Sequence, residues 1–308
     1  MLRFLSRSIF SCTVFLAIAA SSIAQTEHSA ETAAAAPRPT LLSRVQGLFD
    51  FDLPELDPPG TFKLIVHPHL GDLLHRDYLR VTGGLQWALN DRFELRTEAD
   101  FFGNHGLRHG ASGYGTGQLH SGAKYVFPKG THPDFETSVG LNVDTPVGRP
   151  PFDFTDGHYH YSPYIVLQHH TNFERHLTTF GGVSLDFLTL SSVPGAFGRN
   201  APHDDSASLN IGGIYDLGAV KWTLTGTYTT TALSHGSHEN FFTLRPSLLW
   251  FVPKKYLFNG KTQWIVGLGL RSTWGPDGYE LSTSSRVRAE LTFGQVIQQV
   301  REMAGRKK

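Results

Sequence analysis

The sequence of 308 residues contains a single cysteine, Cys12. Because Cys12 lies in a segment that we expect to be removed, the mature protein is predicted to have no disulfide, thiolate metal site or cysteine nucleophile. The sequence also lacks an apolar run of about 18 residues, which a membrane-spanning helix needs. The formal net charge is +0, so the composition gives no reason to expect a nucleic acid partner.

The first 24 residues have the parts of a secretory signal peptide. Arg3 and Arg7 give a positive start, residues 9–20 are apolar, and Ser22 and Ala24 are the small residues of a cleavage site. The apolar core is too short to span a bilayer, which argues against a retained anchor. We therefore predict that residues 1–24 are cleaved and that the mature protein is secreted across the inner membrane.

Residues 25–60 are rich in alanine and then in proline, and we predict a flexible periplasmic lead-in. Within it, residues 41–51 have the composition of a short amphipathic helix. Such a helix could plug a pore, lie on a membrane surface or be part of a linker, and the sequence leaves these alternatives open.

From residue 61 to residue 293 apolar and polar residues alternate in about twelve segments of the length that spans an outer membrane. Residues 220–230 are the clearest case, because one face carries Val220, Trp222, Leu224, Gly226 and Tyr228, and the other carries Lys221 and Thr223, Thr225, Thr227 and Thr229. Side chains of a strand alternate between its two faces. The pattern is typical of a strand with one face toward lipid.

The connections between these segments alternate between short turns and longer loops rich in Gly, Pro, His and Asp, such as residues 103–112, 148–157, 191–205 and 275–282. Outer-membrane barrels place their long loops outside the cell and their short turns in the periplasm. Hydrocarbon satisfies no backbone hydrogen bonds, so the first and last strands must pair. We predict an all-β protein, a closed antiparallel transmembrane β-barrel of about twelve strands, with a helical periplasmic tail at residues 294–308.

Aromatic residues recur near the ends of the predicted strands, at two depths. Rings prefer the boundary between hydrocarbon and headgroups, so we predict contact with membrane lipids at this boundary for Trp87, Phe93, Tyr125, Phe135, Tyr215, Trp222, Tyr228, Trp250, Trp264 and Phe293.

Charged residues recur on the face opposite the apolar one, and this face lines the lumen of a barrel. We predict a lumen and selectivity role for Lys63, Arg80, Glu94, Arg96, Glu98, Asp100, Lys124, Glu136, Arg245, Arg271, Arg286, Arg288 and Glu290. Lumen charges tune the selectivity of a pore. The alternative, that opposite charges pair and fill a narrow lumen, stays open because opposite charges alternate on neighbouring strands.

Sixteen histidines suggest a metal site, but a zinc site needs three or four converging ligands, which their spacing does not indicate. We expect them to be mostly surface residues of loops, and we predict no metal and no cofactor. An acyl hydrolase is a weaker alternative. His235 and Ser237 lie in a predicted loop, and His120 and Ser121 lie on opposite faces of a strand, so neither pair gives a nucleophile with an adjacent, oriented base.

Two stretches resemble a known family. They are residues 121–128, with Gly122, Lys124 and Tyr125, and residues 139–148, with Pro146 and Gly148. Together they resemble the outer-membrane transporter family linked to the meta-cleavage pathway of phenol degradation. The end of the last strand also resembles the terminal strand by which barrel-insertion machinery recognises outer-membrane proteins.

The resemblance implies passage of small organic molecules, hydrophobic or aromatic ones among them. We predict a channel or transporter without enzyme activity in the outer membrane of a Gram-negative-type cell. Its partners would be membrane lipids, a small solute and the insertion machinery. A structural barrel with a closed lumen is the main alternative.

Overall fold

The computed structural model describes residues 53–107, 113–129, 134–171, 176–198, 200–233, 238–253, 256 and 262–295, without the side chains of residues 74, 75, 262, 284, 286 and 292–295. The chain divides into two compact units, Met1–Pro39 and Thr40–Lys308, and every described residue belongs to the second. The predicted signal peptide, the segment at residues 41–51 and the tail beyond residue 295 lie outside the described residues and stay predictions.

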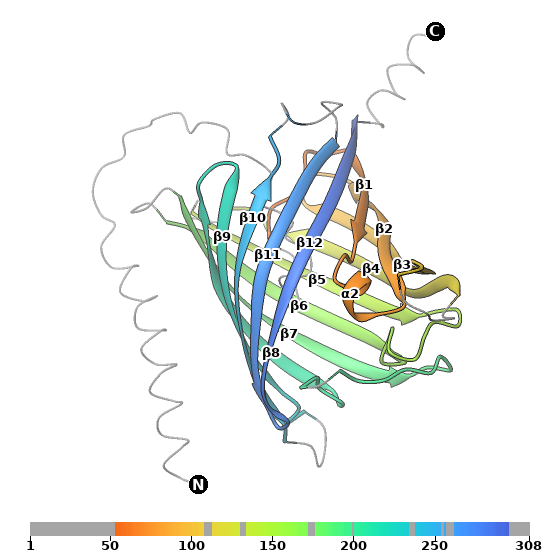
Figure 1. Ribbon diagram of the computed structural model, residues 1–308. Helices are drawn as coiled ribbons and strands as arrows, with labels where there is room; N and C mark the ends of the chain where they lie inside the picture. The colour runs from red at the N-terminus through yellow and green to blue at the C-terminus, as the bar shows by residue number, and fades with distance from the viewer. Residues whose placement is uncertain are drawn as a thin grey trace, which may run out of the picture. The chain divides into compact units, whose positions relative to one another are not determined.

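Twelve strands form one closed antiparallel barrel in which each strand pairs with its neighbours in sequence and β1 pairs with β12 (Figure 1). This confirms the predicted fold class. The strands are β1 Thr61–Pro68, β2 Tyr78–Ala88, β3 Phe93–Asn104, β4 Tyr114–Val126, β5 Phe135–Pro146, β6 His158–His170, β7 Leu177–Leu190, β8 Ser206–Asp216, β9 Val220–Thr230, β10 Asn240–Phe251, β11 Thr262–Gly275 and β12 Gly278–Gln295.

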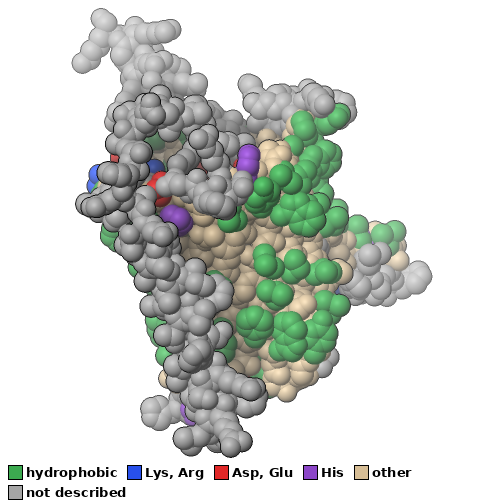
Figure 2. Space-filling model, turned by 90° about the vertical axis from the view of Figure 1, so that its left-hand side faces the viewer, with side chains coloured by type: hydrophobic (Ala, Val, Ile, Leu, Met, Phe, Trp, Pro, Cys, Tyr) green, Lys and Arg blue, Asp and Glu red, His purple; other side chains and the backbone are tan. Residues whose placement is uncertain are grey.

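The two faces of the barrel wall differ as the alternation predicts. On β9, Thr223, Thr225 and Thr227 are buried inside, whereas Trp222 and Leu224 are more than half exposed on the outside. Hydrophobic side chains spread over the outer wall on the face shown in Figure 2. A soluble barrel buries its apolar side chains inside, whereas a lipid-facing barrel exposes them on the outer wall. The wall therefore has the polarity of a barrel that spans a membrane.

One end of the barrel, called the turn side below, carries the short connections at residues 89–92, 171–176 and 217–219. The other end, the loop side, carries the long connections at residues 147–157 and 191–205. The predicted loop at residues 275–282 is wrong: β11 and β12 form one hairpin whose register runs to Gly275 opposite Gly278. Glycine and proline here mark a tight turn rather than a long loop.

Two further details of the wall concern its seam. The connection from β1 to β2 contains a short helix, α2 Asp72–His75. β1 is much shorter than β12, and their register runs from Thr61 opposite Gln295 to Val66 opposite Ala289. In the part of the chain that the structure describes, no helix has the length and apolar character needed to cross a membrane.

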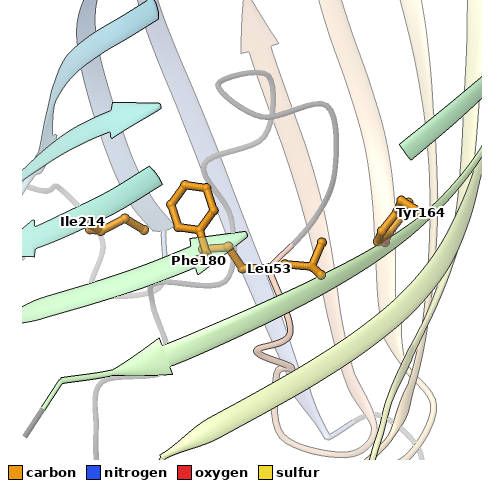
Figure 3. Packing of buried hydrophobic residues seen from close by; sticks show 5 residues of the cluster. Leu53, Tyr164, Phe180 and Ile214 are labelled. Atoms are coloured by element: carbon orange, nitrogen blue, oxygen red, sulfur yellow. The ribbon is translucent and has the colours of Figure 1, made fainter. Parts of the chain in front are cut away.

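Hydrophobic side chains also gather inside the barrel. Tyr164, Val166, Phe180 and Ile214 point inward from β6, β7 and β8 and form one buried cluster with Leu53 of the lead-in. In Figure 3, Leu53 lies between the side chains of Phe180 and Tyr164. Tyr164 lies flat on Gly140, where a Cβ atom would approach its ring to 2.3 Å. The turn-side half of the lumen is therefore filled by side chains and by the lead-in.

Candidate functional site

Residues 53–60 of the lead-in are held inside the barrel by polar contacts as well as by Leu53. The Lys124 ammonium of β4 donates hydrogen bonds to the carbonyl oxygens of Leu53 and Glu55, at 3.0 and 2.9 Å. Gln168 of β6 donates to Glu55 Oε1 at 3.0 Å. Burial raises the pKa of the Glu55 carboxyl, although the Gln168 hydrogen bond opposes this shift. Ordered contacts of this kind fix the segment in the lumen.

Charged side chains from four strands, β1, β3, β4 and β12, surround this segment. Lys63 Nζ lies 2.7 Å from Asp57 Oδ1 and 3.5 Å from Glu290 Oε2. Lys124 Nζ lies 3.4 Å from Glu94 Oε1. All five side chains are buried, and burying an unpaired charge is costly, so each carboxylate needs its cation. Ion pairing braces this half of the lumen, which is what the alternative interpretation of the lumen charges predicts.

The loop-side half of the lumen is different, because it holds a cavity of about 540 Å³. Three kinds of side chain line it in turn around the barrel. A basic arc from β10 to β3 carries Arg245, Arg271, Arg288, Arg80 and Arg96. An acidic and histidine-bearing arc from β3 to β7 carries Glu98, Asp100, His120, Asp144, His160 and Asp186. A hydroxyl arc from β7 to β10 carries Ser184, Ser206, Ser208, Thr227, Thr229 and Thr243.

Two histidines of the acidic arc are each placed between two carboxylates. His120 lies 2.7 Å from Asp144 Oδ1 through Nδ1 and 3.5 Å from Asp100 Oδ2 through Nε2. His160 has the same arrangement with Asp186 and Asp156, both at 2.8 Å. Both ring nitrogens donate only in the imidazolium form, so this geometry favours the charged state.

The expectation that the histidines are mostly surface residues of loops is wrong for part of the set. His67, His120 and His160 line the cavity from strands, and His69 lines it from the residue that follows β1. Their positions share the inward face with the charged residues, and this alternation could have identified them. The pairing of His120 and His160 with aspartates of neighbouring strands depends on register, which the sequence does not give.

Two connections of the loop side fold over the cavity. Phe154 packs with Tyr78 and Phe102 in a buried aromatic cluster, and the Arg80 guanidinium lies 5.6 Å above the Phe154 ring. Asp156 follows Phe154 in the same connection. Burial alone would raise the pKa of Asp156, but hydrogen bonds from His160 and from the His158 backbone lower this pKa below its ordinary value. Asp156 is therefore held ionised beside His160, which lines the cavity.

The connection from β7 to β8 is attached to the hairpin of β11 and β12. The Asn200 backbone N–H donates to Asp277 Oδ2 at 3.3 Å, and Asn200 Oδ1 accepts from the Asp277 backbone N–H at 3.1 Å. Asn200 and Pro202 line the cavity. This attachment holds part of the long loop at the mouth of the lumen.

The structure places the predicted lumen residues in two groups. Lys63, Glu94, Lys124 and Glu290 take part in the ion pairs of the turn side; Arg80, Arg96, Glu98, Asp100, Arg245, Arg271 and Arg288 line the cavity. Glu136 belongs to neither group and pairs with Lys129 at 2.8 Å. The side chain of Arg286 lies outside the description. A selectivity role for these residues stays a prediction.

The predicted interface aromatics point away from the lumen wherever their side chains are described. Tyr215, Trp222, Tyr228, Trp250 and Trp264 are exposed on the outer wall. Trp87, Phe93, Tyr125 and Phe135 are partly exposed. The side chain of Phe293 is outside the description, so recognition of the last strand by insertion machinery stays a prediction.

Neither a metal centre nor a catalytic pair is evident in the described part of the chain. No group of three or more His, Cys, Asp or Glu side chains among the described residues could hold a metal ion. His120 faces the lumen, whereas Ser121 borders an apolar groove on the outer wall, so the two cannot act together. Ser237, the other serine considered, lies outside the described residues.

Comparison with known proteins supports the fold. No family model matches the chain, and no curated protein matches it, so the resemblance to the phenol-pathway transporters stays a prediction. Among solved structures, the chain is similar to an outer-membrane channel from Pseudomonas putida F1, with a TM-score of 0.50, 13% identity and coverage of 77% of this chain and 97% of that one.

Two porins are also similar in shape. The KdgM porin in complex with oligogalacturonate gives a TM-score of 0.41 and 12% identity over 76% of this chain and 99% of that one. The NanC porin gives 0.40 and 8% over 75% and 98%. The fold rests on the closed topology of the chain and on its likeness to the outer-membrane channel above, and it agrees with the apolar outer wall.

Proposed function

We propose that the chain is a passive outer-membrane channel that admits small polar and charged molecules through its lumen. The observation that carries this proposal is the cavity of about 540 Å³ inside the barrel, lined mostly by charged, hydroxyl, histidine and amide side chains. Polar walls lower the cost of moving a hydrated solute through a membrane, and their charges select among solutes.

The hydrophobic or aromatic solutes that the sequence resemblance implies fit this lining less well. Apart from Ile65, Leu185, Pro202 and Phe241, the side chains that border the cavity are polar. An aromatic solute would have to displace the contacts of these groups without replacing them, which costs free energy. The lining therefore favours a polar solute.

A barrel with a closed lumen remains the second candidate, because one specific observation favours it. The turn-side half is filled by the cluster around Leu53 and by the ion pairs of Lys63 and Lys124. In a channel, residues 53–60 must leave this position, at least in part, for solute to pass. In a structural barrel they would stay in place.

Conductance separates the two candidates. The purified full-length chain and a variant lacking residues 25–60 would be inserted into planar lipid bilayers in potassium chloride. A channel predicts discrete current steps in both, larger in the deletion variant because the filler is gone. Silence of both proteins, with the heat-modifiable migration of a folded barrel retained, would contradict the proposal and support a closed structural barrel.

A further inference from the structure

Arg288 of β12 has unused hydrogen-bonding capacity at the inner end of the cavity. Its side chain is 3% exposed, and it lies opposite Ile265, which is buried with Leu249 and Phe251 in a second apolar cluster. Nη1 and Nη2 are both buried, and neither makes a hydrogen bond to any of the described residues. Buried guanidinium groups normally find acceptors, because leaving them unmet costs free energy.

The charge of Arg288 is balanced by Glu290, although the fork formed by its two terminal nitrogens, Nη1 and Nη2, makes no hydrogen bond to the described residues. Nε lies 2.9 Å from Glu290 Oε1, but neither of these atoms has the geometry of a hydrogen bond. Glu290 is shared with Lys63 at 3.5 Å. The residue nevertheless borders the cavity, so a small turn of its guanidinium would bring Nη1 and Nη2 to a group that enters from the cavity.

The surroundings of Arg288 favour an anion. Arg245 and Arg271 line the same cavity, and the register of β10 and β11, with Leu244 opposite Ser272, puts them on neighbouring positions. Arg271 also donates from Nε to Thr273 Oγ1 at 3.2 Å. Two guanidinium groups side by side repel each other, and an anion between or near them relieves this repulsion.

The hydroxyl arc next to Arg245 favours a ligand with hydroxyl groups. Ser208 and Thr229 are joined at 2.7 Å between their oxygens, and both line the cavity beside Thr227 and Thr243. Hydroxyls both donate and accept hydrogen bonds, so such a wall matches a polyhydroxyl chain better than an apolar or a purely anionic one.

We propose that the cavity binds a small hydroxylated carboxylate, with its carboxylate on Arg288 and its hydroxyl groups along the Ser and Thr arc. The planar fork of an arginine matches the two oxygens of a carboxylate. A cavity of about 540 Å³ has the size of sites for small ligands. This inference rests on the proposed function and names the class of solute that the channel would carry.

Isothermal titration calorimetry on the full-length chain in detergent tests the site. Sodium gluconate is the probe, with sorbitol as its uncharged counterpart and inorganic phosphate as a different oxyanion. We expect gluconate to bind at least about tenfold more tightly than sorbitol, because charged hydrogen bonds are worth more than neutral ones. Phosphate is expected to bind more weakly than gluconate.

Arg288→Lys keeps the positive charge beside Glu290 and removes the fork, so gluconate affinity should fall about tenfold or more. Arg92→Lys, in an exposed turn, is the matched control and should leave it unchanged. Ser208→Val with Thr229→Val gives a second variant, which should weaken gluconate without weakening phosphate. It keeps the test decisive if the Arg288 variant fails to fold.

Equal binding of gluconate and sorbitol, unchanged gluconate affinity in folded Arg288→Lys, or phosphate binding as tight as gluconate would overturn the assignment. Because calorimetry needs no bilayer, the two proposals fail separately. Gluconate binding by a barrel that carries no current would refute the channel and keep the site, whereas conductance without gluconate binding would refute the site alone.

Discussion

Lys63 on β1 and Asp57 in the lead-in are joined by an ion pair of 2.7 Å, and both side chains are almost completely covered. Gln86 donates to the other oxygen of Asp57 at 2.9 Å. A residue of the segment that fills the lumen is thus bonded to two strands of the wall. The barrel and its filling segment act as one structure at this point, and the contact can be broken by a single substitution.

Asp57→Asn should loosen residues 53–60 and raise the mean conductance several-fold. Removing one partner of a buried ion pair costs roughly 3–5 kcal/mol, because the other charge stays buried. Lys63 would keep only the longer contact to Glu290 at 3.5 Å. Planar-bilayer recordings would measure the effect. Asp91→Asn, in an exposed turn, is the matched control, and an Asp57 variant with the current of the wild type would contradict the proposed closure.

The seating of the lead-in should depend on pH through Glu55. Burial raises the pKa of this carboxyl above its ordinary value of 4.5, while Gln168, His170 and Lys124 oppose the shift and Glu136 adds to it. A raised pKa means that the seated segment binds the proton more tightly than the free segment. The stabilisation is complete below pH 4.5 and is lost as pH rises through the raised value.

Conductance should accordingly rise as pH increases from about 4 to 7. Glu55→Gln mimics the protonated carboxyl at every pH, so its conductance should stay low and change less over this interval. Current recorded at a series of pH values in wild type and variant would show this. A variant that keeps the full pH dependence would assign the effect to another group.

The acidic arc should influence ion preference. Asp100 is buried and Glu98 borders the same cavity, so Glu98→Ala with Asp100→Ala removes two negative charges from the lumen wall and should shift the reversal potential toward anions. Asp91→Ala with Asp204→Ala removes the same charge from exposed positions and serves as the control. An unchanged reversal potential in a folded double variant would exclude a selectivity role for this pair.

The five tryptophans provide a test of the outward orientation. Trp222, Trp250, Trp264 and Trp274 are all at least 40% exposed on the outer wall. In a bilayer, they should be strongly quenched by brominated lipids and only weakly by iodide in the water. The reverse order of quenching would show that the wall does not face lipid.

Much of the wall could be predicted from the sequence, because alternation is a local property. The alternation of residues 220–230 predicts a strand with the same bounds that β9 has in the structure. Pro246 has no N–H for the ladder, and the pairing of β10 with β11 passes from Leu244 to Ser247 with the register unchanged. Side chains of one strand alternate whatever lies around them, so their direction needs no knowledge of the fold.

The interior could not be predicted in the same way, because its contacts join residues far apart in the sequence. Lys124 binds carbonyl groups of Leu53 and Glu55, and nothing in the lead-in repeats with a period that would place it inside the barrel. Likewise, some charged residues form ion pairs in the turn-side half of the lumen and others line the loop-side cavity. Which residue belongs to which group depends on the register of the strands. Only the register of the closed sheet reveals which charges meet.

The difference in length between β1 and β12 has a consequence for how the barrel comes together and comes apart. β11 pairs with β12 over its whole length, from Thr262 to Gly275. The pairing of β1 with β12, which closes the barrel, joins only Thr61–Val66 to the end of β12. Closing the barrel therefore gains fewer backbone hydrogen bonds than forming the hairpin of β11 and β12 does. The same seam is the place where extraction from lipid by force should begin, with the hairpins elsewhere rupturing later.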